Sequence, residues 1–396
     1  MLAAWPDLGS AWLIVWFWIT ALLGVVWFKR HLDIARGKRE PILAPTDAVT
    51  PDDALPPLSV LVAAKEEEEN IGRCLAGLAA QRYPRLQIIA INDRSVDRTG
   101  AIMDTAAAGE PRLTPVHVKE LPAGWFGKNN AMRCGVERAS GEWLCFTDAD
   151  CRFHAPELLS AAMSFSLRHN VEFLSVLPRL EADTFWERVV QPVAGAIMVY
   201  WNPPQRVNDP RCRAAYANGA FMLMSRRAYD AIGGHDAVKT TLNEDMHMAR
   251  RAKAAGVRFR VIRGGDLYSV RMYTGMRQIW RGWSRIFYGC FGTLPRLAAS
   301  FLLLLVASLS PYVTLATSPL TGPAAPWLAG AAAWAIVGQQ SIMWRFYPLS
   351  GLPARYALTY PLGTVLCLGM ILNAVSRALG ATRTTWRGTT YQGGSR

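Results

Sequence analysis

Two carboxylates stand one residue apart at the end of an apolar segment. The segment Glu142–Asp150 contains no Gly or Pro, which predicts a buried strand that delivers Asp148 and Asp150 to its carboxyl end. Ligands of open α/β sheets bind at that edge, and a turn after Phe146 would let both carboxylates meet one oxygen-seeking cation. The alternative is that both residues cap a helix that begins near Pro156. An Asp-x-Asp pattern alone does not decide between the two.

Acidic residues also follow two earlier predicted strands. The apolar run Leu58–Ala64 leads into Glu66–Glu69, and Leu86–Ile91 leads into Asn92-Asp93. Both runs have the length and composition of strands, and each precedes a helical pattern. Because the carboxyl ends of parallel strands share one edge of a sheet, Asp93 is expected at the same edge as Asp148. Most of Glu66–Glu69 is expected to be solvated.

A basic and an acidic motif follow further along the chain. The segment Leu121–Lys128 is predicted to be a loop with Lys128 at its tip, before a helix over Asn129–Ala139. Glu244-Asp245 stands at the start of a later predicted helix. The simplest interpretation of this pair is an acidic cap that favours the helix N-terminus. A second interpretation is a functional carboxylate.

The composition indicates a membrane protein with a basic surface. The chain has 396 residues, 51% hydrophobic residues and 15 Trp, yet its net charge is +13. An apolar and basic chain fits a cytosolic face near anionic lipid, and the sequence has neither an aromatic-basic RNA signature nor zinc-finger spacing, so no nucleic-acid partner is predicted. The seven Cys include no C-x-x-C pair, which is typical of reduced thiols in the cytosol.

The N-terminal segment is predicted to anchor the chain in a membrane. Leu8–Phe28 has no charged residue and is long enough to cross a bilayer. A cleaved signal peptide fits poorly, because no Lys or Arg precedes this run and no small-residue cleavage site follows it. Lys29, Arg30 and Arg36 place the following residues in the cytoplasm by the positive-inside rule. Residues 1–28 are therefore expected to be an anchor, and 29–57 a basic, Pro-rich linker.

The C-terminal part contains further apolar segments. Residues 271–292 combine Arg with Trp, Phe and Tyr, which predicts an interfacial amphipathic helix. Residues 297–376 hold three long apolar runs, Leu297–Thr317, Ala324–Trp344 and Ala357–Val375. If all three crossed, the basic tail 377–396 would lie outside, against the positive-inside rule. One run is therefore expected to be re-entrant or interfacial, and the sequence does not show which one.

The motifs taken together resemble a known family. Strands and helices alternate over 58–270, as a mostly parallel α/β sheet requires. The order of Glu67, Asp93, Asp148-x-Asp150, Glu244-Asp245 and Gln278-x-x-Arg281 resembles the family 2 glycosyltransferases, which are inverting enzymes with the nucleotide-sugar-binding fold called GT-A. The resemblance covers about residues 58–290. With transmembrane helices at both ends, the chain is most similar to the ceramide glucosyltransferase and hopene-associated branches.

The resemblance implies a role for each motif residue. It implies that Asp148 and Asp150 bind Mg²⁺ or Mn²⁺ at the donor's diphosphate, and that Asp245 is the general base. The implied donor-binding residues are Glu67, Asp93, Lys128 and Asp148. The implied catalytic residues are Asp245 and Arg281, the latter as a fork for the diphosphate. The residues implied on the acceptor or diphosphate side are Glu244, Gln278, Trp280 and Trp283.

Two positions depart from the family's pattern. Asn92 stands where many members carry the first of two adjacent Asp. Arg281 and Trp283 are separated by one residue, whereas the family usually places Arg and Trp side by side. Trp280 could therefore substitute for Trp283 as the aromatic face for the acceptor or sugar.

The predicted function is transfer of one sugar from a nucleotide sugar, with UDP as the expected nucleotide, to a membrane lipid hydroxyl. The protein is expected to be integral to the cell (inner) membrane, with its catalytic domain cytoplasmic. One alternative is a processive polysaccharide synthase, for which three C-terminal runs are few. Another is a catalytically inactive membrane scaffold, which would not require the acidic positions that this chain retains.

Overall fold

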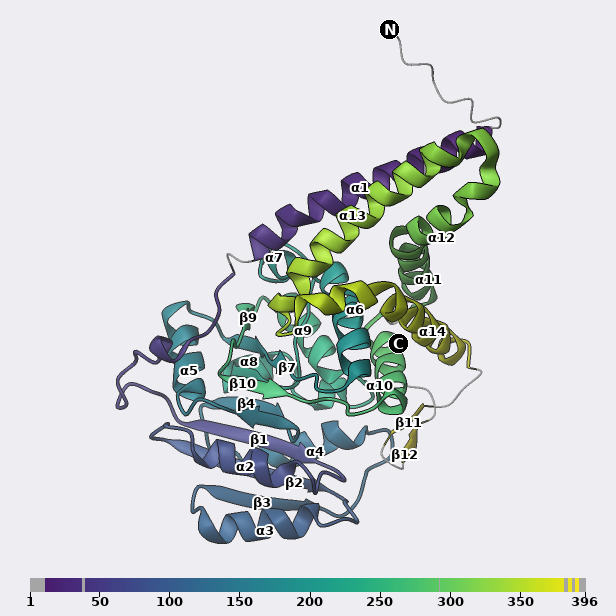
Figure 1. Ribbon diagram of the computed structural model, residues 1–396. Coiled ribbons are helices and arrows are strands. Elements are labelled where there is room, and N and C mark those ends of the chain that lie inside the picture. The colour runs from purple at the N-terminus through teal and green to yellow at the C-terminus, as the bar shows by residue number, and fades with distance from the viewer. Residues whose placement is uncertain (1–10, 38–39, 292, 381–383, 387–388, 392–396) are drawn as a thin grey trace. The chain divides into compact units, whose positions relative to one another are not determined.

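The structure, a computed structural model, describes residues 11–37, 40–291, 293–380, 384–386 and 389–391 (Figure 1). The chain divides into two compact units. We call them the sheet unit, formed by Glu40–Glu181, Val199–Met272 and Arg383–Arg396, and the helical unit, formed by Met1–Arg39, Ala182–Met198 and Tyr273–Thr382.

A seven-stranded sheet forms the centre of the sheet unit. Its strands are β1 (Leu58–Ala64), β2 (Leu86–Asp93), β3 (Leu113–Val118), β4 (Trp143–Asp148), β6 (Phe173–Leu177), β8 (Met222–Ser225) and β9 (Phe259–Arg263). They lie in the order β3-β2-β1-β4-β8-β6-β9. All neighbours are parallel except β8, which is antiparallel to β4 and β6. The predicted mixed, mostly parallel α/β sheet is confirmed.

Two smaller sheets complete the strand content of the described residues. One contains β5 (Cys151–Phe153), β7 (Arg179–Leu180) and β10 (Tyr268–Val270), with β10 in the middle. The other pairs β11 (Thr384–Trp386) with β12 (Thr389–Tyr391). Because β5 begins three residues after β4 ends, the chain turns sharply at residues 149–150.

Helices cover both faces of the large sheet, so its central strands are apolar on both sides. On one face α2 (Ile71–Ala79), α3 (Thr99–Gly109) and α5 (Leu158–Arg168) share a core with Val60 and Val62 of β1. On the other face α4 (Gly127–Val136), α8 (Arg226–Ala231) and α9 (Glu244–Ala254) share a core with Leu61. Successive side chains of a strand point to opposite faces, which explains this alternation along β1.

Several predicted boundaries change in the structure. Lys128 is the second residue of α4 instead of the tip of a loop, because the helix begins at Gly127. Strand β8 begins only at Met222, although the apolar run Ala217–Met224 starts five residues earlier. The preceding residues form a turn in which Asn218 Oδ1 accepts a hydrogen bond from the Ala220 amide (2.9 Å). Side-chain capping of this kind competes with strand pairing.

The predicted linker 29–57 is part of the fold. Its first residues continue α1 (Ala11–Gly37), and Leu43 and Leu55 are buried in the core of the sheet unit. The Leu43 amide donates to the carbonyl of Arg263 on β9 (2.8 Å). Prolines of this density predict a spacer, yet the two leucines attach this segment to the sheet unit.

The helical unit contains the apolar segments at both ends of the chain. Besides α1, it holds α6 (Phe185–Trp201) up to Met198, α10 (Met276–Phe291), α11 (Leu294–Leu303), α12 (Ser310–Thr317), α13 (Ala325–Leu349) and α14 (Tyr360–Ala378). A π-helical segment, Leu304–Leu309, joins α11 to α12. A 3-10 segment, Ser318–Ala324, joins α12 to α13 and is kinked at Gly322.

Three helical stretches are long and apolar enough to cross a membrane. They are Ala11–Arg36, Leu294–Leu349 and Ala354–Ala378. The two runs predicted at 297–317 and 324–344 are therefore halves of one bent helical stretch. The run predicted at 357–375 corresponds to α14 and the short 3-10 segment before it.

We expect Gly141→Ala to destabilise the sheet unit. A Cβ at position 141 would lie 2.5 Å from the backbone nitrogen of Ser59 and 2.7 Å from the carbonyl oxygen of Trp143. Backbone atoms of two paired strands cannot shift cheaply, so a loss of about 1–3 kcal/mol is expected. Gly109→Ala is the matched control, since a Cβ there meets nothing within 4 Å. Thermal unfolding in detergent should show a lower midpoint for Gly141→Ala alone; equal midpoints would contradict the packing described here.

Candidate active site

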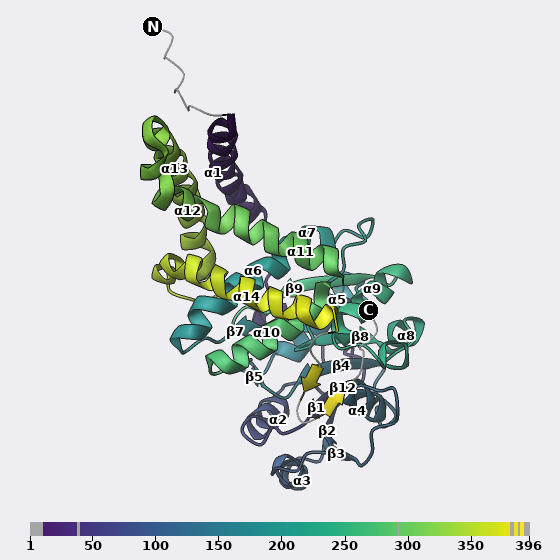
Figure 2. The same ribbon diagram turned by 90° about the vertical axis from the view of Figure 1, so that its right-hand side faces the viewer.

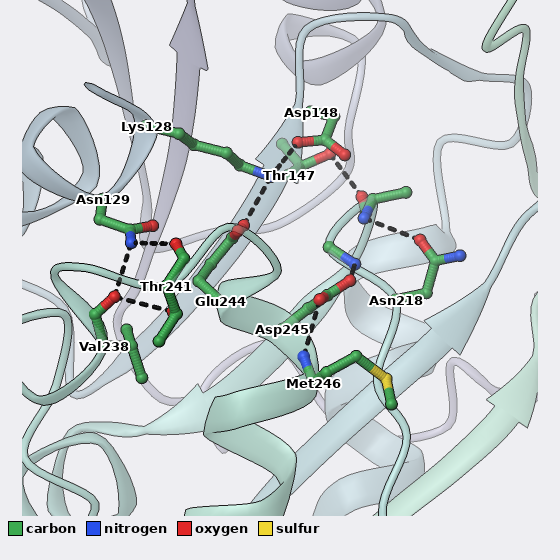
Figure 3. A network of polar contacts seen from close by, with 12 residues as sticks. Lys128, Asn129, Thr147, Asp148, Asn218, Val238, Thr241, Glu244, Asp245 and Met246 are labelled. Atoms are coloured by element: carbon green, nitrogen blue, oxygen red, sulfur yellow. Dashed lines mark hydrogen bonds and ion pairs between the residues drawn. The ribbon is translucent and has the colours of Figure 1, made fainter. Parts of the chain in front are cut away.

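The carboxyl end of β4 is the starting point of the site. Asp148 is the last residue of the strand, and Asp150 follows in the turn to β5. The Thr147 hydroxyl donates to the carbonyl of Ala220 (2.7 Å), which ties the end of β4 to the turn before β8 (Figure 3). This bond brings a second loop to the edge where Asp148 lies.

Lys128 lies between two carboxylates from distant parts of the chain. Its Nζ is 2.6 Å from Asp148 Oδ1 and 2.7 Å from Glu244 Oε1, as Figure 3 shows. Burial by itself would lower the pKa of Lys128, but the two carboxylates raise it well above its usual value. The ammonium is therefore charged at neutral pH, and it holds β4, α4 and α9 together at one point.

Asn129 positions α4 against the loop that precedes α9. Its side-chain amide donates to the carbonyls of Val238 (2.7 Å) and Thr241 (3.0 Å) (Figure 3). The Phe126 amide, at the N-terminal end of α4, also donates to the carbonyl of Lys239 (2.8 Å). These bonds fix the start of α4 beside the start of α9, so Lys128 reaches Glu244.

Asp245 is held by two backbone amides. Its Oδ2 accepts from Gly219 (3.0 Å) and its Oδ1 accepts from Met246 (2.7 Å). Burial, together with the charge of Glu244, nevertheless raises the pKa of Asp245 to about 7. A carboxyl group with a pKa near 7 is suited to accept a proton at neutral pH.

Gly219 is a site residue that the sequence analysis missed. A Cβ at this position would lie 3.2 Å from Lys128 Nζ and 3.6 Å from Asp245 Oδ2. The absence of a side chain therefore lets the backbone approach both groups. A signal was present, since Asn218-Gly219 is a turn pair, but a turn pair inside an apolar run does not reveal what surrounds it.

Asp150 is the candidate cation ligand in the turn after β4. Its Oδ1 is buried and has no hydrogen-bond partner among the described residues. Burial, followed by the charges of Asp148 and Glu67, raises the pKa of Asp150 to about 7. Leaving a buried carboxylate oxygen without a partner is unfavourable, so a divalent cation between Asp148 and Asp150 would fit this donor set.

The number of protein ligands indicates the kind of metal site. In the described parts of the chain, no group of three or more His, Cys, Asp or Glu side chains is arranged to hold a metal ion. Mg²⁺ is often held by one or two carboxylates together with substrate phosphates and water. Asp148 and Asp150 could supply two such carboxylates.

The loops after β1 and β2 are bonded to each other. The carboxylates of Glu66 and Glu68 accept hydrogen bonds from the amides of Val96 (3.0 Å) and Arg98 (3.1 Å). Glu68 and Glu69 are exposed and Glu66 and Glu67 are half-buried, which agrees with the expectation that most of this run is solvated. The bonds between the loops hold Glu67, whose amide donates to Thr99 Oγ1 (2.8 Å).

Asp93 is buried at the end of β2 and already has a partner. Its two carboxylate oxygens accept from Arg94 Nε (2.8 Å) and Nη2 (3.2 Å). A Cβ on Gly127 would lie 2.5 Å from Asp93 Oδ2, so the start of α4 covers this carboxylate closely. The structure brings Asp93 to the same sheet edge as Asp148, while its contact with a nucleotide stays a prediction.

The predicted residues of α10 lie in the helical unit. Gln278 and Arg281 are exposed, and Gln278 Oε1 accepts from the Thr274 amide (2.9 Å). Trp283 is buried and packs against Phe287, with ring centroids 5.6 Å apart. Trp280 is more exposed than Trp283, so it is the better aromatic face for a ligand. Their roles toward the acceptor stay predictions.

The sheet order and the polar residues at its carboxyl edge define a GT-A nucleotide-sugar-binding fold. A mannosyltransferase from Pyrobaculum calidifontis, solved with GDP-Man and Mn²⁺, shares this fold with a TM-score of 0.53. The match covers 93% of this chain and 97% of that one at 20% sequence identity. This likeness concerns the fold alone.

Residues 59–233 match the family model described as Glycosyl transferase family 2, and this part of the chain belongs to that family. The chain is 27% identical to a 4,4'-diaponeurosporenoate glycosyltransferase of Staphylococcus aureus (strain MRSA252) over 265 residues, which are 66% of this chain and 69% of that protein. The enzyme of the same name from strain USA300 is 26% identical over 265 residues. The protein is a glycosyltransferase.

We expect Asp150→Asn to weaken Mn²⁺ binding by about tenfold or more, because it removes the charge and leaves an amide in a buried position. Electron paramagnetic resonance of free Mn²⁺, recorded while protein is added in the presence of UDP, measures the Mn²⁺ affinity directly. Asp266→Asn is the matched control, since its side chain is 87% exposed and pairs only with Arg179 among the ion pairs of the described residues. Unchanged Mn²⁺ affinity in Asp150→Asn would exclude this ligand.

Proposed function

We propose that this protein is an inverting, metal-dependent hexosyltransferase that moves a single sugar from a nucleotide sugar to a hydroxyl group of a membrane lipid. The observation that supports it best is the cluster in which Lys128 joins Asp148 to Glu244, with Asp245 beside it. One side of this cluster suits a charged leaving group and the other suits a proton acceptor. UDP-sugars are the first donors to test.

The donor side of the proposal uses Asp148, Asp150 and Lys128. Asp148 and Asp150 would hold Mg²⁺ or Mn²⁺, and the bound cation would neutralise charge on the departing diphosphate. Glu244 keeps Lys128 beside Asp148, so the ammonium would add a second positive charge there. Glu67 and Asp93, at the ends of the neighbouring strands, would face the nucleotide and its ribose.

The acceptor side uses Asp245. The acceptor hydroxyl oxygen would form a bond to the anomeric carbon on the face opposite the diphosphate, and the bond from that carbon to the diphosphate oxygen would break. The hydroxyl proton would pass to Asp245, and the nucleoside diphosphate would leave with the electron pair. The two amides that hold Asp245 fix its orientation for this transfer.

A named relative supports the proposed lipid acceptor, and the membrane helices support the proposed location. The Staphylococcus aureus relative is named for transfer to diaponeurosporenoate, a lipid-related acceptor. Lys29, Arg30 and Arg36 at the end of α1 favour a cytoplasmic position for the residues that follow. We propose that the protein lies in the cell (inner) membrane and that Arg281 and Gln278, both exposed on α10, act on the diphosphate or the acceptor.

A transfer assay tests the proposal as a whole. Purified protein would be incubated with radiolabelled UDP- and GDP-sugars, Mn²⁺ and a total membrane lipid extract. One sugar should appear on a lipid, and EDTA should abolish transfer. Mild alkali would distinguish a glycosidic bond to a hydroxyl, which is stable, from a glycosyl ester. A polymer would favour a processive synthase, and no transfer from any donor would favour an inactive scaffold.

The base assignment predicts a pH profile. Because Asp245 must be ionised to accept a proton and its pKa is about 7, kcat/KM at saturating Mn²⁺ should rise about tenfold per unit below pH 7 and level off above pH 8. Asp245→Asn should lower transfer by roughly 10²–10⁴-fold while UDP still binds. Asp230→Asn, at an exposed position, is the control. Full transfer by Asp245→Asn would show that another group is the base.

A further inference from the structure

Helices α1 and α13 lie side by side and run in the same direction. Both views show the pair (Figures 1 and 2). In order along α1, the contacts are Leu13 with Leu328, Phe28 with Trp334 (ring centroids 4.4 Å apart) and His31 Nε2 with Ser341 Oγ (2.9 Å). Residue numbers rise together along the two helices, so α1 and α13 are parallel.

The stretch before α13 runs the opposite way. Trp27 Nε1 donates to the carbonyl of Ala307 (2.9 Å), whereas Trp16 Nε1 donates to the hydroxyl of Thr314 (2.9 Å). Residues 307–324 therefore lead from the Trp27 end of α1 back to the Leu13 end. There the chain turns at Gly322, whose φ of 58° is the left-handed conformation that glycine adopts readily.

The charges identify which end of this bundle faces the cytoplasm. Residues 11–28 and 297–344 contain no charged residue. Lys29, Arg30 and Arg36 follow at one end of α1, and Arg345 Nη1 donates to His31 Nδ1 (2.6 Å) at the same end. By the positive-inside rule this end is cytoplasmic. The turn at Gly322 then lies on the other side of the membrane.

Helix α14 begins at the cytoplasmic end. The hydroxyl of its first residue, Tyr360, bonds with that of Ser308 (2.8 Å), and the rings of Tyr360 and Trp27 are 6.1 Å apart. Beyond Tyr360, the axis of α14 is not parallel to the axes of α1 and α13. In both views it runs across the direction of α1 and α13 (Figures 1 and 2).

Beyond its first residues, α14 packs against α10, α11 and α6 as well as against the π-helical segment Leu304–Leu309. A Cβ on Gly369 would lie 2.6 Å from Trp280 Cη2 of α10, so glycine allows this close approach. Gly363 is in close contact with the backbone of Val189 on α6 in the same way. Helix α14 also packs against α11, which precedes Ala307. These helices form a layer that adjoins the cytoplasmic end of the bundle.

We propose that α14 lies in the cytoplasmic leaflet together with α10, α11 and the helical-unit part of α6, and does not cross the bilayer. The chain then crosses three times, through α1, residues 307–324 and α13. This identifies α14 as the interfacial run that the sequence required but did not specify. The basic tail 377–396 stays in the cytoplasm, which satisfies the positive-inside rule.

The exposed face of α14 fits lipid acyl chains. Leu362, Val365, Leu372 and Leu379 are exposed and recur along one face, whereas Gly363, Cys367 and Met370 on the other face are buried. A row of exposed Leu and Val of this kind suits contact with lipid acyl chains. Arg277 and Arg281 of α10 are exposed in the same layer, where anionic headgroups would meet them. The inference concerns the membrane surface and does not depend on the proposed chemistry.

Spin-label depth tests this inference on the full-length protein. Leu372 lies twelve residues after Tyr360, so in a crossing helix it would be about 18 Å deeper than Tyr360. In vesicles of phosphatidylethanolamine and phosphatidylglycerol, a nitroxide at Leu372→Cys should lie about 5–10 Å into the headgroup boundary. Leu22→Cys, with a similarly exposed leucine in the middle of α1, should lie near the bilayer centre. Equal depths would overturn the proposal.

Cysteine labelling gives a second readout. Cys134 and Cys212, the two cysteines that are not buried, would first be replaced by Ser. In this background, the variants Leu320→Cys and Ser395→Cys would be treated with a membrane-impermeant maleimide on intact cells. Leu320→Cys, 85% exposed at the turn before α13, should be labelled. Ser395→Cys should react only after the cells are opened. Labelling of Ser395→Cys on intact cells would show that α14 crosses. Size-exclusion profiles of both variants would confirm folding.

Discussion

A single ammonium group between two carboxylates is the interaction on which the site depends. Lys128 joins the end of β4 to the start of α9, and these elements lie about a hundred residues apart in the chain. The buried carboxylate of Glu244 would be unfavourable without a cation, whereas Asp148 is only partly buried. The sheet provides the common edge and Asn129 fixes the approach of α4, but the charge of Lys128 makes it possible for Asp148 and Glu244 to be neighbours.

One lysine does not balance the acidic groups around it. Asp150 and Asp245 both have a pKa of about 7, and in both cases burial is the main cause and a neighbouring carboxylate adds to it. Their remaining contacts differ. Asp245 accepts two backbone hydrogen bonds, whereas Asp150 Oδ1 has no partner among the described residues. In the proposed function, the same excess of buried negative charge would suit Asp245 to proton transfer and Asp150 to a divalent cation.

In the helical unit, charge and packing distinguish the apolar helices that are proposed to cross the membrane from the one that is proposed to lie at its surface. Hydropathy treats α13 and α14 alike, because both are long and apolar. Their neighbours differ, since α13 follows α1 along its length through paired contacts such as His31 with Ser341, while α14 packs on α10 through Gly369. A lipid acceptor could reach a glycosyltransferase from such an interfacial layer without leaving the membrane.

The sequence by itself determined the alternation of strands and helices, the apolar segments and the acidic motifs, because these depend on local periodicity and residue type. It placed Asp148, Asp150 and Asp245 among the candidates but gave no reason for Gly219 or Asn129, whose roles depend on atoms about 26 and 110 residues away. It also misjudged the prolines of 41–57 and the start of α4. Only the tertiary structure decided that Asp148 is paired with Lys128, that Asp150 Oδ1 has no partner among the described residues, and that α14 runs across α1 and α13. Long-range contacts between buried groups have no local signature in the chain.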